Sequence, residues 1–520
     1  MSKKNLIKST SIIGGATVAS RVLGFVRDVL FAKFFGTNMF AQAFVVAFRL
    51  PNMLRDMVGE GATNAAIVPV LTEYKHIKSD EEYWDAARAI LNLMITALIV
   101  ITAIGVLFAP LLIRLIAPGF LQDPKKYQMT VTLTRMMFPY ILLLGLVAYA
   151  KGVLNSLNYF TTPAFSPVIL NITLIFSLFV LCPVLGIKGL VFGVILGGIG
   201  EILIQIKPLK ARGFTIKGVF NLVHPVIKRV GKLLLPRALG SAVYQLSIFV
   251  DTILASLAWV VGAGGVAGLY YANRIVHLPL AVFGISLATA VLPKMSKEIA
   301  VNNKEEFKKT ISFSLRTVFT VMIPAIAGLL VLSRSIITIL FQRGAFTEYS
   351  TGITTKALFF YSFGLFAYAG IKILVSAYYS MGDTKTPVKT AAFSLLINIV
   401  LNLILMWPLK IGGLALATSI AAITNFIILY VLLIRKIGDI ETKRTVLSFL
   451  KITMAAIVMG ICTYFLKEYL LKDAEGVSAA IRLVLTILSS LGVYLLFGWI
   501  MGVEGIRKGL EHLFSRVHRA

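Results

Sequence analysis

Apolar stretches of about 20 residues recur along the whole chain, with short polar connections between them. A helix of that length crosses the ~30 Å hydrocarbon core of a bilayer, because each residue advances it by about 1.5 Å. The alternating pattern that is typical of membrane strands is absent. The sequence therefore predicts an all-α polytopic membrane protein with 14 transmembrane helices.

Several of these predicted spans are longer than a perpendicular crossing requires, which indicates tilted helices. Composition agrees with the assignment, because 58% of the residues are hydrophobic and 14% are charged, whereas roughly a quarter of a soluble domain is charged. The mean hydropathy is +0.87. The spans are expected at about 9–34, 38–72, 84–116, 128–156, 160–183, 187–206, 227–258, 263–294, 306–342, 348–380, 386–408, 411–436, 444–470 and 476–502.

The net charge of +28 would suggest a nucleic-acid partner in a soluble protein. Here the basic residues gather in alternate connections, which is the bias that orients membrane helices with their positive loops in the cytoplasm. The longest hydrophilic connection, residues 207–232, holds seven Lys or Arg residues and no acid. The distribution predicts that both termini are cytoplasmic and that nucleic acid is not a partner.

Three short motifs return at nearly one spacing and indicate an internal duplication. "GLVAYA" at 145–150 returns as "GLFAYA" at 364–369, and "AAIVPVL" at 65–71 has a counterpart in "TAVLPKM" at 289–295. The dipeptide Thr162-Pro163 returns as Thr386-Pro387. Because the offset spans six helices, both copies enter the membrane in the same direction and form a parallel repeat.

The repeat predicts two six-helix bundles plus two extra C-terminal helices. The expected parts are an N-terminal lobe at 1–206, a cytoplasmic linker at 207–226, a C-terminal lobe at 227–436, and transmembrane helices 13 and 14 with a cytoplasmic tail at 437–520.

Charged residues interrupt the apolar pattern in the first, second and eighth spans. A charge at the centre of a membrane helix costs at least ~2.5–3.5 kcal/mol, so each needs a partner or a polar cavity. Pro51 and Pro279 lie in the second and eighth spans and should kink these helices. The candidate substrate-binding residues are Arg21, Arg27, Asp28, Arg49, Arg55, Glu60 and Arg274.

Two explanations of these charges are open. They could form an internal ion-pair network, in which Arg27 pairs with Asp28, and Arg55 with Asp56 or Glu60. Against it, the arginines outnumber the acids, and adjacent residues point to different faces of a helix. A surplus of guanidinium groups in a water-filled cleft instead predicts an anionic substrate, and the planar guanidinium is well matched to phosphate.

The segments "SRVLGFVRDVLFAKFFG", "AFRLPNMLRDMVGEGATNAAIVPVL", "YYANRIVHLPLAVFGISLATAVLP" and "GDTKTPVK" resemble the MurJ (MviN) lipid II flippases. These belong to the multidrug/oligosaccharidyl-lipid/polysaccharide exporter superfamily, and the resemblance covers essentially the whole chain. It implies a bacterial cytoplasmic-membrane protein of peptidoglycan biosynthesis. Such a protein moves lipid II, an undecaprenyl-diphosphate-linked precursor, from the inner to the outer leaflet by alternating access.

The resemblance also assigns roles to parts of this chain. It implies that Arg21, Arg27, Arg55 and Arg274 lie in the cavity, and that spans 13 and 14 form a hydrophobic groove for the lipid tail. Two positions depart from the family pattern, since many relatives carry acids at the positions of Gln42 and Asn273. Both changes make the predicted cavity more positive.

Other function classes fit the sequence less well. A cation-coupled multidrug exporter, or an exporter of another polysaccharide lipid from the same superfamily, is the main alternative, although a drug exporter should have a less basic cavity. An enzyme is not expected, because the outward connections are short and show no nucleophile–base spacing or metal-ligand cluster.

One further acid, Asp251, lies inside the seventh span with no Lys or Arg within ten residues. Carboxylate, amide, hydroxyl and carbonyl oxygens are ligands for a hard cation. The resemblance implies sodium binding between the seventh, eleventh and twelfth spans, since some members of the family bind sodium there, with an acid at the position of Asn402. No other cofactor is expected. Alternatively, Asp251 is protonated or hydrogen-bonded to two asparagines. The candidate ligands of a monovalent cation, Na⁺, are Asp251, Asn398, Asn402, Leu414 and Thr418.

The predicted orientation can be tested with single cysteines and an impermeant thiol reagent in intact cells. Cysteines at Lys3, Thr215 and Ser515 should be shielded, because they lie in cytoplasmic segments. A cysteine at Gly262, in a glycine-rich outer turn, should be labelled. Labelling at position 215 from outside would reverse the orientation.

Overall fold

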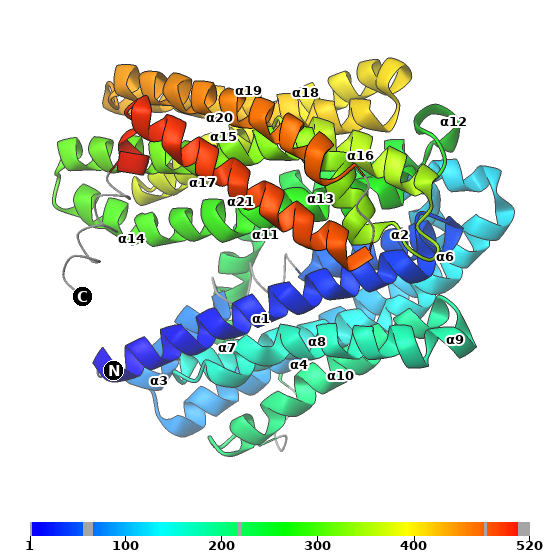
Figure 1. Cartoon of the computed structure of the whole chain (residues 1–520). Coiled ribbons are helices and arrows are strands. Elements are labelled where there is room, and N and C mark those ends of the chain that lie inside the picture. The colour runs from blue at the N-terminus through cyan, green and yellow to red at the C-terminus, as the bar shows by residue number, and fades with distance from the viewer. Residues whose placement is uncertain (1–2, 56–65, 216–220, 473–475, 508–520) are drawn as a thin grey trace. The chain divides into compact units, whose positions relative to one another are not determined.

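A computed structural model describes residues 3–55, 66–215, 221–472 and 476–507, which are helical almost throughout and include no β-strand (Figure 1). Asp56 and Glu60 lie outside the described residues. The helices cluster into two compact units, Met1–Leu257 and Ala258–Ala520. The lobe boundaries drawn from the internal repeat stay a prediction.

The first unit is built around α8, which packs between α1 and α10, while α10 also packs against α7 (Figure 1). Helix α2 packs on α6, and α11 packs on α4 and α5. Its elements are α1 (Lys3–Phe35), α2 (Met39–Leu54), α3 (Val68–Ile77), α4 (Asp80–Leu107), α5 (Ala109–Ile116), the 3₁₀ helix η2 (Pro118–Gln122), α6 (Pro124–Met137), α7 (Pro139–Ser156), α8 (Thr161–Val180), α9 (Cys182–Leu185), α10 (Lys188–Lys210) and α11 (Pro225–Ser256).

In the second unit, α15 packs against α14, α16, α17 and α20, and α19 packs against α18. The last two long helices pack on each other and on α15. Its elements are α12 (Ala258–Val261), α13 (Gly265–Pro279), the π-helix η3 (Leu280–Ile285), α14 (Ser286–Ala300), α15 (Lys304–Phe341), α16 (Glu348–Ser362), α17 (Leu365–Ser380), α18 (Lys385–Leu409), α19 (Ile411–Ile437), α20 (Thr442–Leu470) and α21 (Gly476–Ile500).

The all-helical membrane architecture predicted from the sequence is confirmed. Among the described residues, ten helical segments are long and apolar enough to cross a membrane, or eleven if α16 and α17, bent by 46°, form one span. The count of 14 stays a prediction. Apolar side chains on these helices are exposed, as expected where lipid surrounds the protein; examples are Leu107, Phe176, Leu396, Ile457 and Leu488.

The second and eighth spans, which hold Pro51 and Pro279, depart from regular α-helix, as their sequences predict. After Pro51 the chain has π-helical geometry at Arg55, and again at 66–67. After Pro279 the π-helix η3 separates α13 from α14. Proline removes a backbone donor and interrupts the hydrogen-bond ladder, so regular α-helical bonding is lost near each arginine.

The turn before α13 affects the choice of topology reporter. Gly262 has a φ of +93°, a conformation that a cysteine adopts only with strain. Ala263 is exposed in the same turn and is the better position for the outer reporter.

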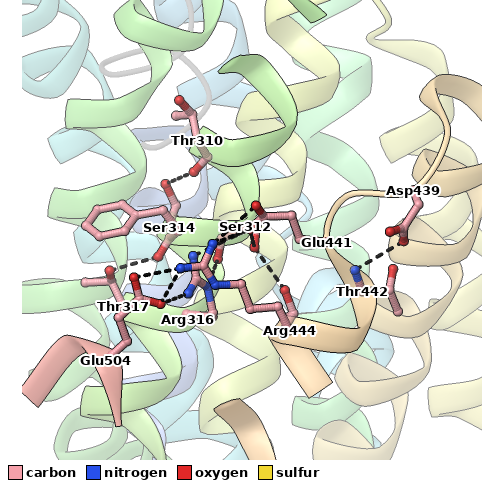
Figure 2. Close-up of polar contacts among 12 residues, drawn as sticks. Thr310, Ser312, Ser314, Arg316, Thr317, Asp439, Glu441, Thr442, Arg444 and Glu504 are labelled. Carbon is pink, nitrogen blue, oxygen red and sulfur yellow. Dashed lines mark hydrogen bonds and ion pairs between the residues drawn. The ribbon is translucent and has the colours of Figure 1, made fainter. Parts of the chain in front are cut away.

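Four charged side chains connect α15 to the start of α20 and to the segment after α21 (Figure 2). Arg316, buried on α15, pairs with Glu504 and lies 3.6 Å from a carboxylate oxygen of Glu441. Arg444 donates to both Glu504 oxygens at 2.9 Å. Ser312 donates to Glu441 at 2.9 Å. The network thus attaches both ends of the α20–α21 hairpin to α15.

Arg316→Ala should lower the melting temperature of the purified protein, because it removes the buried guanidinium and leaves Arg444 as the remaining counter-charge of Glu441 and Glu504. The loss should be about 1–3 kcal/mol, between the values for exposed and fully buried pairs. Arg334→Ala is the matched control, since its pair with Glu348 is about 60% exposed on both sides. Equal melting temperatures for the two variants would show that the network contributes no more than a surface pair.

Candidate functional site

Arg27 lies on α1, eight residues before the helix ends at Phe35, and is held by two neighbours. Its Nε and Nη2 donate to one Asp28 oxygen at 3.0 and 2.7 Å, and its Nη1 donates to Asn171 Oδ1 on α8 at 2.9 Å. Asn171 is positioned in turn, because its Nδ2 donates to the Ser20 and Pro167 carbonyls. The Arg27 side chain keeps 16% of its surface exposed. The guanidinium is therefore both fixed and accessible.

The argument that Arg27 and Asp28 should not pair because they point to different helix faces is wrong. Asp28 is buried, with 4% of its side chain exposed, and forms an ion pair with Arg27. The arginine side chain is long enough to turn back over its neighbour, so adjacency in sequence does not prevent pairing. The ion-pair explanation is thus correct for this pair, whereas the role of Asp28 in substrate binding stays a prediction.

Arg55 is the residue that caps the C-terminal end of α2, and it lies near polar groups of two other helices. Its backbone N–H donates to the Asn52 and Pro51 carbonyls. Its charge acts on Glu201 of α10 and on Tyr140 of α7, and Arg27 also acts on Tyr140. The first unit therefore brings Arg27 and Arg55 into one polar region.

The other two arginines of the first unit differ in their surroundings. Arg49 donates through Nη1 to the Ile248 carbonyl at 3.1 Å and to the Thr252 hydroxyl, so it connects α2 to α11. This is a helix-packing contact. Arg21 is exposed on α1.

Arg274 belongs to the second unit. Its Nη2 donates to the Tyr270 hydroxyl at 3.1 Å, and its guanidinium carbon lies 4.7 Å from the centre of the same ring. The two residues are one turn apart on α13, so the contact orients Arg274 along its own helix. Asn273 next to it is exposed.

Gln42, where many members of the resembling family carry an acid, is buried in α2. Its Oε1 accepts from the Lys126 ammonium at 3.0 Å, and its Nε2 donates to the Thr37 carbonyl at 3.2 Å. The Lys126 ammonium also lies 3.7 Å from the centre of the Phe120 ring. Gln42 therefore joins α2 to α6 and is a structural residue here.

The candidate cation ligands of the second unit form one hydrogen-bonded chain. Asn402 Nδ2 donates to Asn398 Oδ1 at 3.1 Å, and Asn398 Nδ2 donates to the Thr418 hydroxyl at 3.3 Å. The hydroxyl donates to the Leu414 carbonyl at 3.0 Å. Both asparagines are buried between α18 and α19. Asp251 lies on α11, in the first unit.

Sequence analysis missed the polar residues that surround the arginines in space. Asn171, Tyr140 and Glu201 lie on three helices distant in sequence from α1 and α2. Glu201 carried a usable signal, because it is an acid within the apolar stretch "GGIGEILIQ". Asn171 and Tyr140 carried none, since isolated polar residues are common in membrane helices.

A family model described as lipid II flippase MurJ matches residues 31–485. A probable lipid II flippase MurJ from Buchnera aphidicola subsp. Acyrthosiphon pisum is 37% identical over 429 residues. That match covers 82% of this chain and 83% of the relative.

Two solved structures resemble the fold. A lipid II flippase MurJ in an inward closed conformation has a TM-score of 0.80 and 30% identity, and the match covers 94% of this chain and 98% of the other. An inward-facing multidrug resistance MATE family transporter of the MOP superfamily has a TM-score of 0.66 over 81% of this chain and 95% of the other. At 14% identity the second resemblance shows the fold alone.

Proposed function

The chain belongs to the MurJ family of lipid II flippases, and we propose that Arg27 and Arg55 of its first unit bind the diphosphate of lipid II during transport. As a member of this family, the protein is a membrane transporter and not an enzyme. Its substrate is a polyprenyl-diphosphate-linked glycopeptide that crosses from the inner to the outer leaflet. Arg274 of the second unit stays a predicted ligand of the same headgroup.

The observation that carries this assignment is the fixed and accessible guanidinium of Arg27. Asp28 and Asn171 orient it, and 16% of its side chain stays exposed. A pre-oriented guanidinium loses less entropy when it binds phosphate. Arg55 supplies a second positive charge nearby. Together they offset the two negative charges that would otherwise make the headgroup costly to move through hydrocarbon.

Transport requires that this site open to one side of the membrane at a time. The headgroup would enter from the cytoplasmic side, bind the arginines, and leave on the outer side after a change of conformation. Basic residues at the end of α10 and the start of α11, including Lys207, Lys210, Lys228 and Arg229, support a cytoplasmic placement of this connection and of both termini.

The polyprenyl tail would stay in lipid or against the last two helices. Helices α20 and α21 expose large apolar side chains, among them Leu450, Met454, Ile457, Ile481, Val484 and Leu488. A tail in contact with these side chains never leaves an apolar environment, so the arginines act on the headgroup alone.

A multidrug exporter is the weaker alternative. The MATE transporter shares the fold at 14% identity, whereas the family match and the MurJ structure share sequence over most of the chain. The fixed arginine also favours an anionic substrate.

Arg55→Ala should abolish complementation of a strain depleted of its own flippase and should leave lipid II in the inner leaflet. Arg27→Ala should do the same, but it also removes the counter-charge of buried Asp28. The double variant Arg27→Ala/Asp28→Asn removes both charges and should fold yet fail to transport. Lysine at either position should rescue partly, because it lacks the planar fork.

Expression level and melting temperature control for folding, and Arg343→Ala serves as a matched substitution on the second unit. Growth supported by both Arg55→Ala and the double variant at reduced expression would make these arginines structural. The assignment of the diphosphate to them would then be lost.

We propose further that a monovalent cation binds the second unit weakly. The oxygens of Asn398, Thr418 and Leu414 suit a hard cation, but each accepts a hydrogen bond in this structure. A cation would have to replace some of these hydrogen bonds, which favours low affinity. Asp251 is the predicted carboxylate ligand.

Sodium should raise the melting temperature of the detergent-purified protein relative to choline at equal ionic strength, since a ligand of the folded state stabilises it. Asp251→Asn and Asn402→Ala should each remove the difference. Equal responses to sodium and choline in wild type and variants would leave these residues as structural hydrogen-bonding groups.

A further inference from the structure

Glu201 is a carboxyl group buried in the first unit that substrate binding does not by itself explain. It lies on α10 with 4% of its surface exposed, more than two turns from either end of the helix. No ion pair within 4 Å involves it in the described part of the chain. An ionised carboxylate in such a place is costly unless a charge or a proton compensates it.

The packing of α10 explains how Glu201 meets polar groups of other helices. A Cβ on Gly198, one turn before Glu201, would lie 2.8 Å from the Tyr140 ring, and one on Gly197 would lie 2.6 Å from Leu170. These glycines let α7 and α8 approach α10 closely. The Tyr140 side chain is buried in that contact, and its hydroxyl has no hydrogen-bond partner among the described residues.

The groups that face Glu201 come from three elements. The Ser166 hydroxyl of α8 lies nearby without a hydrogen-bond partner among the described residues, and the positive charges of Arg55 and of Lys151 on α7 lie within electrostatic range of Glu201. Tyr140 of α7 is the titratable group beside it. Helices α6 and α9 also pack on α10, and among the described residues they add no charged group to this set.

Arg55 is therefore shared between two possible anions, the Glu201 carboxylate and the substrate diphosphate. A guanidinium drawn to an ionised Glu201 has less positive potential to offer phosphate. A protonated Glu201 leaves that potential to the substrate. Because coupling between two sites is reciprocal, a proton that strengthens diphosphate binding is itself bound more tightly when the diphosphate is present.

We propose that Glu201 is a proton-binding site coupled to substrate binding at Arg55. This inference rests on the proposed function of Arg55 and adds to it. When the headgroup binds, the Glu201 carboxylate takes a proton from water and becomes a neutral carboxylic acid. When the headgroup leaves, the proton returns to water and the carboxylate again attracts Arg55.

The sign of the pH dependence follows from this competition. Lower pH favours the neutral acid and hence tighter binding of lipid II, whereas higher pH favours the carboxylate and weaker binding. Coupling between sites in proteins commonly amounts to roughly five-fold or more in affinity. The diphosphate of lipid II is esterified at both ends, so it does not titrate near neutral pH and cannot imitate the effect.

The experiment is titration calorimetry of detergent-purified protein with lipid II at pH 6 to 8, in buffers with different enthalpies of ionisation. Wild type should take up a fraction of a proton on binding and lose roughly five-fold or more in affinity as the pH rises. Glu201→Gln, which imitates the neutral acid, should bind tightly at every pH without proton uptake. Glu73→Gln should behave as wild type, since Glu73 is an exposed partner of Arg229.

The outcomes separate this inference from the proposed function. Zero proton uptake by wild type would overturn it even if Glu201→Gln failed to fold. Unchanged proton uptake and pH dependence in Glu201→Gln would overturn it as well, while loss of binding in Arg55→Ala would still support the diphosphate site. Wild-type binding of lipid II by Arg55→Ala would reject the site itself, and with it the coupling.

Discussion

A charged side chain inside a membrane must be compensated, and the first unit is arranged around this requirement at Arg27. Its guanidinium is held by Asp28 on the same helix and by Asn171 on α8. Asn171 is held in turn by the hydrogen bonds that its Nδ2 donates to backbone carbonyls on α1 and α8. The α1–α8 contact and the placement of the arginine therefore depend on each other, because neither helix satisfies the polar group alone.

Close helix packing is the second condition for this polar region. Within a bilayer the association of helices relies on van der Waals contact. Small residues at the interface therefore contribute more than large apolar side chains, because they let the helices approach closely. Gly193, Gly197 and Gly198 of α10 have no room for a larger side chain against α7 and α8. This packing keeps Glu201 out of lipid and places it beside groups that can share its charge.

The second unit compensates its polar residues differently. Arg274 lies against Tyr270 of its own helix, and Arg316 pairs with Glu504 and Glu441 near the ends of α20 and α21. The buried Asn402 amide donates to Asn398, and the Asn398 amide donates to Thr418 between α18 and α19. The Tyr270 contact of Arg274 thus lies within one helix, whereas Arg27 also bonds to a second helix.

The sequence by itself determined the membrane-helical class and the positions of the arginines within the apolar helices. These follow from local hydropathy and from the length of helix that crosses a bilayer. Tertiary structure decided which groups meet the arginines. The Arg27–Asp28 pair depended on side-chain reach, and Asn171 and Glu201 lie on α8 and α10, far from Arg27 and Arg55 in sequence. Periodicity assigns a residue to a helix face, but packing alone determines what that face touches.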